Sequence, residues 1–231
     1  MTTLTLTIAN KVYSSWSLRP WVLMRELAIP FEEKSAPFES DSNWAAFRAF
    51  SPAGKVPCLH DGDSVVWDSL GITEFLAERY PGVWPEDAKA RIWARCAAAE
   101  MHSGFGTLRQ TCPFHLGLRI RLNDVSPALQ HDIDRLNELW SEGLQRFGGP
   151  FLAGATFTAV DAFFAPVVFR AQTYGLPLND AAAAYAQHML TLPSMRQWQE
   201  QALNETAREA SHEAAVLAAG TLLADHRHNP A

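Results

Sequence analysis

The hydrophobic pattern of the first eighty residues predicts alternating strands and helices. Leu4, Leu6 and Ile8 alternate with threonines, which is typical of a half-buried strand. The same kind of pattern predicts, in chain order, a helix over about 17–27, a weak strand over 31–34, a short helical or irregular segment over 43–50, strands over 56–59 and 65–67, and a helix from about 69. The expected order is βαβαββα, and its strand–helix alternation favours a partly parallel sheet.

The pattern after residue 88 is helical throughout. A connection over 80–88, with two prolines and a glycine, separates this part from the first. Ser126 and Pro127 begin a helix with a continuous apolar stripe, and Thr158 with Asp161 has the form of a capping box before a nearly all-apolar helix over 162–174. The other expected elements are helices over 88–110, 180–190 and 193–209, followed by a frayed tail over 226–231. We therefore expect an all-α second domain.

Composition narrows the class of protein. The chain has 231 residues, of which 48% are hydrophobic and 19% charged, as in an ordinary globular protein. The net charge of −6 and the absence of a Lys/Arg cluster argue against a nucleic-acid partner. No apolar run has the length of a membrane span and no leader precedes the first strand, so we expect no membrane association. The three cysteines show no CxxC spacing, which argues against disulfides and metal and favours a reducing cytoplasm.

The exit of the predicted hairpin carries the first candidate chemistry. Asp68 and Ser69 end the second hairpin strand and open the next helix, with Ser69 a preferred N-cap residue. A helix N-terminus attracts an anion, and the adjacent carboxylate attracts a cation. This pair therefore suits a ligand that carries both a carboxylate and an ammonium group.

The run Ser-Pro-Ala-Gly-Lys-Val-Pro-Cys-Leu over 51–59, followed by Asp68 and Ser69, resembles the glutathione-binding half of a glutathione S-transferase. The resemblance implies a cis Val56–Pro57 bond, pairing of the Val56 backbone with glutathione, and binding of the γ-glutamyl end by Asp68 and Ser69. It also implies an α/β thioredoxin-like domain over 1–82, an all-α domain over 88–231 and a homodimer. The remaining glutathione contacts that it implies are Ser15 and Lys55, although a surface charge is the simpler interpretation of Lys55.

The reactive position is expected in the turn between the first strand and the first helix. Thioredoxins carry their cysteines there, whereas this chain has Ser14-Ser15-Trp16-Ser17, which excludes a disulfide cycle. The run resembles the serine motif of zeta-class transferases, with Trp16 in place of its cysteine. Carried over, Ser14 is the catalytic hydroxyl that faces the glutathione sulfur. Ser15 is the nearest substitute, Ser17 would help to cap the helix, and the alternative for Ser14 is an ordinary turn serine.

The resemblance implies that glutathione is the co-substrate, without a metal. A hydroxyl and a helix N-terminus together can stabilise its thiolate by the ~2.7 kcal/mol that a two-unit shift of a thiol pKa requires. The thiolate would then attack a small hydrophobic electrophile held by the helical domain. The predicted pocket residues are Met101, His102, Phe105 and Arg109. A purely packing role is the simpler interpretation of His102 and of the Met/Phe wall.

Three functions remain open at this point. The first is a serine-type glutathione S-transferase. The second is a glutathione-dependent cis–trans isomerase of a maleyl-type diacid, which needs cations such as Arg19 or Arg109 to hold the carboxylates. The third is a non-catalytic protein that binds glutathione or another ligand. The sequence names neither the electrophile nor the pathway.

Overall fold

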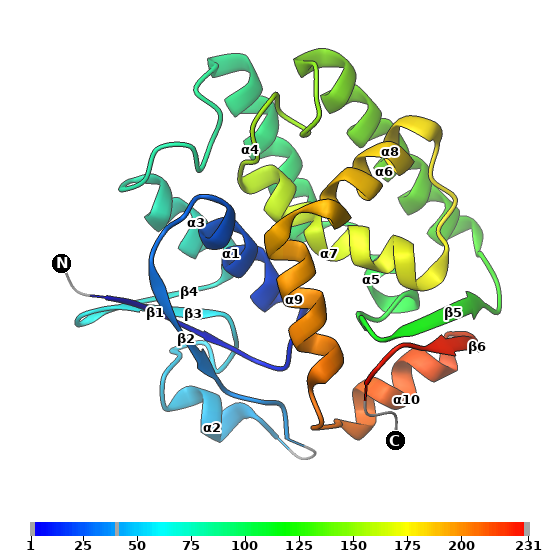
Figure 1. The fold of residues 1–231 in the computed structure, drawn as a ribbon, viewed down its shortest axis with the longest axis horizontal. Coiled ribbons are helices and arrows are strands. Elements are labelled where there is room, and N and C mark those ends of the chain that lie inside the picture. Colours follow the sequence, from blue (N-terminus) through cyan, green and yellow to red (C-terminus); the bar gives the residue numbers. More distant parts are fainter. Residues whose placement is uncertain (1–2, 40–41, 229–231) are drawn as a thin grey trace.

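The computed structural model of the chain describes residues 3–39 and 42–228. Its N-terminal domain contains a four-stranded sheet in the order β2-β1-β3-β4 (Figure 1). Strand β1 pairs in parallel with β2 and antiparallel with β3, and β3 pairs antiparallel with β4. The bounds are β1 (Leu4–Ile8), β2 (Phe31–Ser35), β3 (Cys58–Asp61) and β4 (Ser64–Trp67), with helices α1 (Ser15–Glu26), α2 (Trp44–Arg48) and α3 (Ser69–Ala77). The predicted βαβαββα order is confirmed.

The C-terminal domain is mainly helical, so the fold class is also confirmed. Its helices are α4 (Ala88–Ser103), α5 (Gly106–Thr111), α6 (Pro127–Phe147), α7 (Ala159–Tyr174), α8 (Asp180–Thr191), α9 (Pro193–Asn204) and α10 (Ala210–Ala218). The expected capping box is present, because Asp161 Oδ2 accepts hydrogen bonds from the backbone N–H and the hydroxyl of Thr158 at 3.0 and 3.4 Å. Ser126 caps α6 as expected, through a 3.2 Å bond from the N–H of Leu129.

Two expected helices are each divided in the structure. The prediction of one helix over 88–110 is wrong, because Phe105 adopts a left-handed conformation with φ of 53° and separates α4 from α5. The helix expected over 193–209 ends at Asn204. The next residue, Glu205, uses its carboxylate to accept the backbone N–H groups of Lys11 and Val12 at 2.7 and 3.2 Å. A new helix, α10, then begins after Glu209.

The C-terminal part also contains a two-stranded antiparallel sheet that the all-α expectation omitted. Strands β5 (Leu118–Leu122) and β6 (Gly220–Asp225) form it, and they lie beside α10 in Figure 1. The tail expected to be frayed is anchored as far as the structure describes it. Arg227 is buried and pairs with Asp225 and Glu213, while 229–231 lie outside the described residues.

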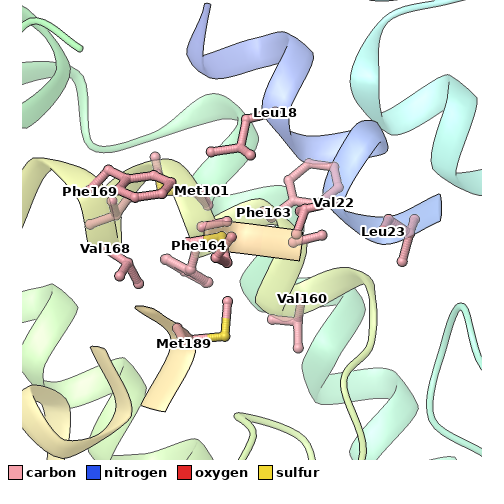
Figure 2. Packing of buried hydrophobic residues seen from close by; sticks show 14 of the residues in the cluster. Leu18, Val22, Leu23, Met101, Val160, Phe163, Phe164, Val168, Phe169 and Met189 are labelled. Carbon is pink, nitrogen blue, oxygen red and sulfur yellow. The ribbon is translucent and has the colours of Figure 1, made fainter. Parts of the chain in front are cut away.

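The core continues from one domain into the other. Leu18 and Val22 of α1 face Phe163 and Phe164 of α7, and all four are fully buried (Figure 2). The Trp21 ring of α1 meets Trp198 of α9 edge-on at 5.1 Å. Because α1 packs against α7 and α9, its N-terminal turn is held at the junction of the two domains. That turn carries the predicted catalytic serine.

Candidate functional site

The β1–α1 turn presents Ser14 at the start of a twelve-residue helix. The Ser14 carbonyl accepts the N–H of Leu18 at 3.3 Å, so α1 begins at Ser15, two residues earlier than predicted. Ser14 is 4% exposed, and its hydroxyl donates a hydrogen bond to the hydroxyl of Ser17 at 2.7 Å. Ser17 does not cap the helix as expected. Its oxygen instead accepts the N–H of Ala9 at 3.3 Å and ties the helix to the end of β1.

The loop before β3 brings a second backbone segment to this turn. The Val56–Pro57 peptide is cis, as the resemblance implied. Gly54 has a φ of +59°, and a Cβ there would lie 2.5 Å from the Trp44 ring, so glycine is required on two counts. The N–H of Gly54 bonds to the Ser51 carbonyl at 2.9 Å, which closes the turn ahead of Lys55.

The helix α3 begins at Ser69, as predicted, but its N-cap is not the expected residue. Asp68, and not Ser69, is the N-cap, and its carboxylate accepts the N–H of Leu70 at 2.8 Å. Asp68 adopts φ of 68° and ψ of 138°, a conformation that costs a non-glycine residue about 1–3 kcal/mol. The other carboxylate oxygen lies 3.6 Å from His102 Nε2. Ser69 is buried as the first residue of the helix.

These three segments border one cavity of about 810 Å³, within the range of small-molecule sites. It lies between the two domains, because residues of α5, α7 and α10 complete its wall. The lining residues that the sequence analysis named as candidate contacts are Ser14, Ser15, Lys55, Val56, Asp68, Ser69 and Arg109. The structure therefore brings together the whole predicted glutathione set and one residue of the predicted electrophile pocket.

The other predicted pocket residues do not line this cavity. Met101 is fully buried among Phe163, Phe164 and Phe169 in the core (Figure 2). Phe105, the residue with left-handed backbone conformation between α4 and α5, is also buried. His102 lies behind the wall. Its ring meets Trp16 edge-on at 5.3 Å, its Nδ1 is buried without a partner, and burial lowers its pKa more than Asp68 raises it.

Three arginines converge on the side of the cavity formed by α1, α5 and α7. Arg109 and Arg170 line it, and Arg19 lies behind Trp16 with its guanidinium 4.0 Å from the indole ring centre. Their acceptors are neutral. Arg19 donates to Ser69 Oγ at 3.5 Å, and Arg109 and Arg170 donate to the carbonyls of His102 and Cys112 at 3.3 and 2.8 Å.

Burial and mutual repulsion act on this arginine set. Burial, followed by the charges of Arg170 and Arg109, lowers the pKa of Arg19 to about 9. Burial lowers the pKa of Arg170 to about 10. Both groups remain cationic at neutral pH, and Arg19 Nε is buried without any hydrogen-bond partner. The set is therefore a preorganised place for an anionic group.

Tyr13, Phe38 and His212 form another part of the cavity wall. Tyr13 does not offer its hydroxyl to the cavity, because that hydroxyl donates to Glu213 at 2.5 Å. Burial and this hydrogen bond raise the pKa of Tyr13. A tyrosine tied in this way cannot replace Ser14 as the donor to a thiolate.

The sequence analysis missed Arg170 and His212. A charged residue inside the nearly all-apolar run 162–174 was the available signal for Arg170, since a buried arginine needs a specific reason. Nothing in the sequence pattern separated His212 from the other seven histidines. Its place in the cavity depends on how α10 folds back over the N-terminal domain.

Comparison with known proteins agrees with this architecture. The model of the glutathione S-transferase N-terminal domain matches residues 13–79, and that of the C-terminal domain matches residues 122–191. Together they cover more than half of the chain, which therefore belongs to the glutathione S-transferase family, a family of transferases. The homodimer expected from the resemblance and the cytoplasmic location expected from the cysteine pattern stay predictions.

Individual relatives come from several classes of this family. A zeta-class glutathione S-transferase of Euphorbia esula is 28% identical over 130 residues, 55% of this chain and 58% of that protein. A probable maleylacetoacetate isomerase of Caenorhabditis elegans is 25% identical over 71% of this chain and 77% of its own length. Glutathione S-transferase theta-1 of Homo sapiens is 26% identical over 86% of this chain and 83% of its own length.

Solved structures share the fold at lower identity. A glutathione transferase homologue from Burkholderia, crystallised with bound glutathione, matches with a TM-score of 0.65 and 22% identity over 87% of this chain and 98% of that one. The tau-class enzyme of mango, Mangifera indica, matches with a TM-score of 0.67 and 18% identity over 94% and 97% of the two chains.

Metal-binding clusters and membrane-spanning helices are both absent from the described residues. No cluster of three or more His, Cys, Asp or Glu side chains in 3–39 and 42–228 is arranged to hold a metal ion. Over the same part of the chain, no helix combines the length and apolar character needed to span a membrane.

Proposed function

We propose that this protein is a glutathione S-transferase in which Ser14 stabilises the thiolate of glutathione for attack on an electrophile. The observation that carries the proposal is the position of the Ser14 hydroxyl. It lies at the N-terminus of α1, is nearly buried, and lines the same cavity as the cis-Pro57 loop and the Asp68–Ser69 pair. Every group that the resemblance assigns to glutathione therefore borders one space.

The residues of the cavity fit each end of glutathione chemically. Asp68 supplies a carboxylate for an ammonium group, and the N-terminus of α3 with Ser69 supplies donors for a carboxylate. Lys55 is exposed at the cavity edge, where a cation can meet the second carboxylate of the peptide. Ser15 stays the nearest substitute for Ser14, because it too lines the cavity.

The hydroxyl of Ser14 acts as a hydrogen-bond donor and not as a nucleophile. Its proton is directed at Ser17 in the structure, and hydroxyl groups rotate to suit a new acceptor. A hydrogen bond to a charged acceptor contributes about 1.5–3 kcal/mol, and a helix N-terminus adds about 0.3–1 kcal/mol. The sum approaches the ~2.7 kcal/mol that a two-unit decrease in thiol pKa requires.

The test is an ultraviolet titration of the thiolate of bound glutathione. We expect the wild-type protein to lower the thiol pKa by about two units and Ser14→Ala to restore it to near its free value. Ser15→Ala is the matched control, because it removes the neighbouring hydroxyl in the same wall. A free-thiol pKa in the wild type would contradict the proposal and favour the non-catalytic binder, whereas a shift lost only in Ser15→Ala would transfer the role to Ser15.

The arginine set favours a second candidate function, the glutathione-dependent isomerase of a maleyl-type diacid. That activity requires cations for the carboxylates of the substrate, and Arg109 and Arg170 supply them in the cavity wall, with Arg19 behind. It uses the same thiolate as the transferase. Both functions therefore predict an electrophile that carries at least one carboxylate, and the neutral hydrophobic electrophile expected from the sequence fits this wall less well.

A further inference from the structure

A histidine–glutamate pair in the cavity wall has no role in thiolate activation. His212 of α10 lines the cavity, and its Nδ1 lies 2.5 Å from Glu209 Oε2. The Glu209 side chain is 5% exposed and accepts three further hydrogen bonds, from the N–H and hydroxyl of Ser211 and the N–H of His212. These bonds outweigh burial and lower the pKa of Glu209 to about 2. The carboxylate is thus a fixed anion that orients the imidazole.

Two aromatic rings also hold the imidazole in place. Tyr13 stacks on it with ring centres 5.0 Å apart, and Phe38 stacks on it at 4.9 Å. Tyr13 immediately precedes Ser14 in the chain, so this stack sets His212 beside the turn that holds the proposed thiolate donor. The Tyr13 hydroxyl donates to the carboxylate of Glu213, and His115 and Arg227 bond to the same carboxylate.

This arrangement is typical of a proton-transfer group. Histidine is the side chain most often used for general acid–base catalysis near neutral pH, and a carboxylate on one ring nitrogen fixes the orientation of the other. A helix-capping role alone explains the bonds of Glu209 to the backbone. It does not explain why the imidazole stacks on two aromatic rings in the wall of a cavity.

We propose that His212, oriented by Glu209, is a further catalytic residue that donates a proton to the adduct of glutathione and an α,β-unsaturated carbonyl compound bearing a carboxylate. The inference rests on the proposed function. The thiolate sulfur forms a bond to the β-carbon, and the π-electron pair moves toward the carbonyl as an enolate. The enolate α-carbon takes the proton of the His212 imidazolium, which becomes neutral imidazole and regains a proton from water.

The proton decides which product leaves the site. An enolate that is protonated becomes the stable glutathione adduct. An enolate that is not protonated expels the thiolate again and returns to the alkene, as either the cis or the trans isomer. His212 therefore controls the partition between conjugation and isomerisation, the two functions that share the thiolate. Arg109 and Arg170, which line the same cavity, hold the carboxylate of the substrate in both cases.

The experiment measures this partition with cis-acetylacrylate, a keto acid with an activated double bond. The variant is His212→Asn, whose amide nitrogen takes the place of Nδ1 and keeps the bond to Glu209. Nuclear magnetic resonance gives the ratio of adduct to trans isomer. Because general acids contribute about 10²–10⁴-fold, we expect the ratio to fall at least ~10-fold. His131→Asn, on the exposed face of α6, is the matched control and should keep the wild-type ratio.

Each outcome bears on the inference separately from the proposed function. An unchanged ratio in His212→Asn, with the thiol pKa of bound glutathione still lowered, overturns the role of His212 and leaves the transferase intact. The same holds if only the affinity for glutathione falls, which would assign His212 to binding. A wild-type protein that binds glutathione at its free-thiol pKa and turns over no acetylacrylate overturns both.

Discussion

The hydrogen bond between Ser14 and Ser17 decides which hydroxyl can reach a bound thiolate. Ser17 is fully buried and accepts the N–H of Ala9, so its oxygen is fixed at the end of β1. Ser14 is the outer member of the pair and lines the cavity. Because hydroxyls rotate, Ser17 can donate to Ser14 while Ser14 donates to the sulfur. A chain of two hydroxyls strengthens the outer donor, which favours Ser14 over the more exposed Ser15.

The arginine set leads to a prediction about substrate charge. Replacing Arg109 with glutamine removes one cation from the cavity wall but keeps a polar side chain of similar length. We expect the KM for acetylacrylate to rise roughly tenfold, because a hydrogen bond to a charged group contributes about 1.5–3 kcal/mol. The KM for its neutral methyl ester should change little. Steady-state kinetics with both compounds gives the two values.

The control for Arg109→Gln is Arg146→Gln, which removes an exposed arginine of α6 that pairs with Glu142. It should leave the acid-to-ester ratio of KM values at the wild-type level. Equal losses for acid and ester in Arg109→Gln would mean that the guanidinium supports the wall and does not bind the carboxylate.

Adjacent residues of the site could be predicted from the sequence, and residues brought together by the fold could not. Asp68 and Ser69 follow a recognisable hairpin, so their cavity position was predictable even though the N-cap was assigned to the wrong member of the pair. Met101 failed as a pocket residue because helical periodicity does not say which apolar face meets a cavity and which meets α7. His212 depends on tertiary contacts with Tyr13 and Phe38.

Helices with a strong stripe and local caps agree with their predicted bounds. The stretch 126–147 has both, and α6 occupies it nearly unchanged. The divided helices failed for non-local reasons. Glu205 ends α9 by bonding to Lys11 and Val12, almost two hundred residues away, and no local pattern indicates such a partner. The strands β5 and β6 pair across a separation of about one hundred residues, and neither is long enough to be distinguished from a short helix by periodicity.

The position of α10 over the cavity depends on the carboxylate of Glu213. It accepts hydrogen bonds from Tyr13, His115 and Arg227 at 2.5, 3.1 and 2.8 Å. Burial alone would raise the pKa of Glu213, but these partners lower it to about 2. As the pH falls below about 4.5, the unfolded chain takes up this proton before the folded one. The stabilisation is therefore present above pH 4.5 and is lost between about pH 4.5 and 2.

Replacing Glu213 with glutamine tests this element. We expect the free energy of unfolding at pH 7 to fall by about 2 kcal/mol, because glutamine lacks the negative charge that Tyr13, His115 and Arg227 share. The difference between wild type and Glu213→Gln should shrink as the pH is lowered through the same window. Urea titrations at a series of pH values measure it. A difference that stays constant with pH would show that the carboxylate charge does not hold α10.

The two predicted domains, 1–82 and 88–231, share one core at the scale of the whole molecule. α1 belongs to the first by sequence, yet Leu18 and Val22 are buried against α7 of the second (Figure 2). The sequence pattern predicted this helix but did not identify its packing partner, because both a sheet and a helix can cover an apolar helix face. We therefore propose that the two domains have different architectures but unfold together as one cooperative unit.

Replacing Val22 with alanine tests that proposal. The change removes two buried methyl groups at the domain junction, at ~0.8 kcal/mol each plus the cavity left behind, so the free energy of unfolding should fall by about 2 kcal/mol. If the domains unfold together, circular dichroism and tryptophan fluorescence will follow one shared urea transition, displaced equally in the variant. Val125→Ala, at a position 41% exposed, is the matched control and should displace neither. Two separate transitions, with only one displaced by Val22→Ala, would show that the Ser14 turn belongs to an independently stable domain.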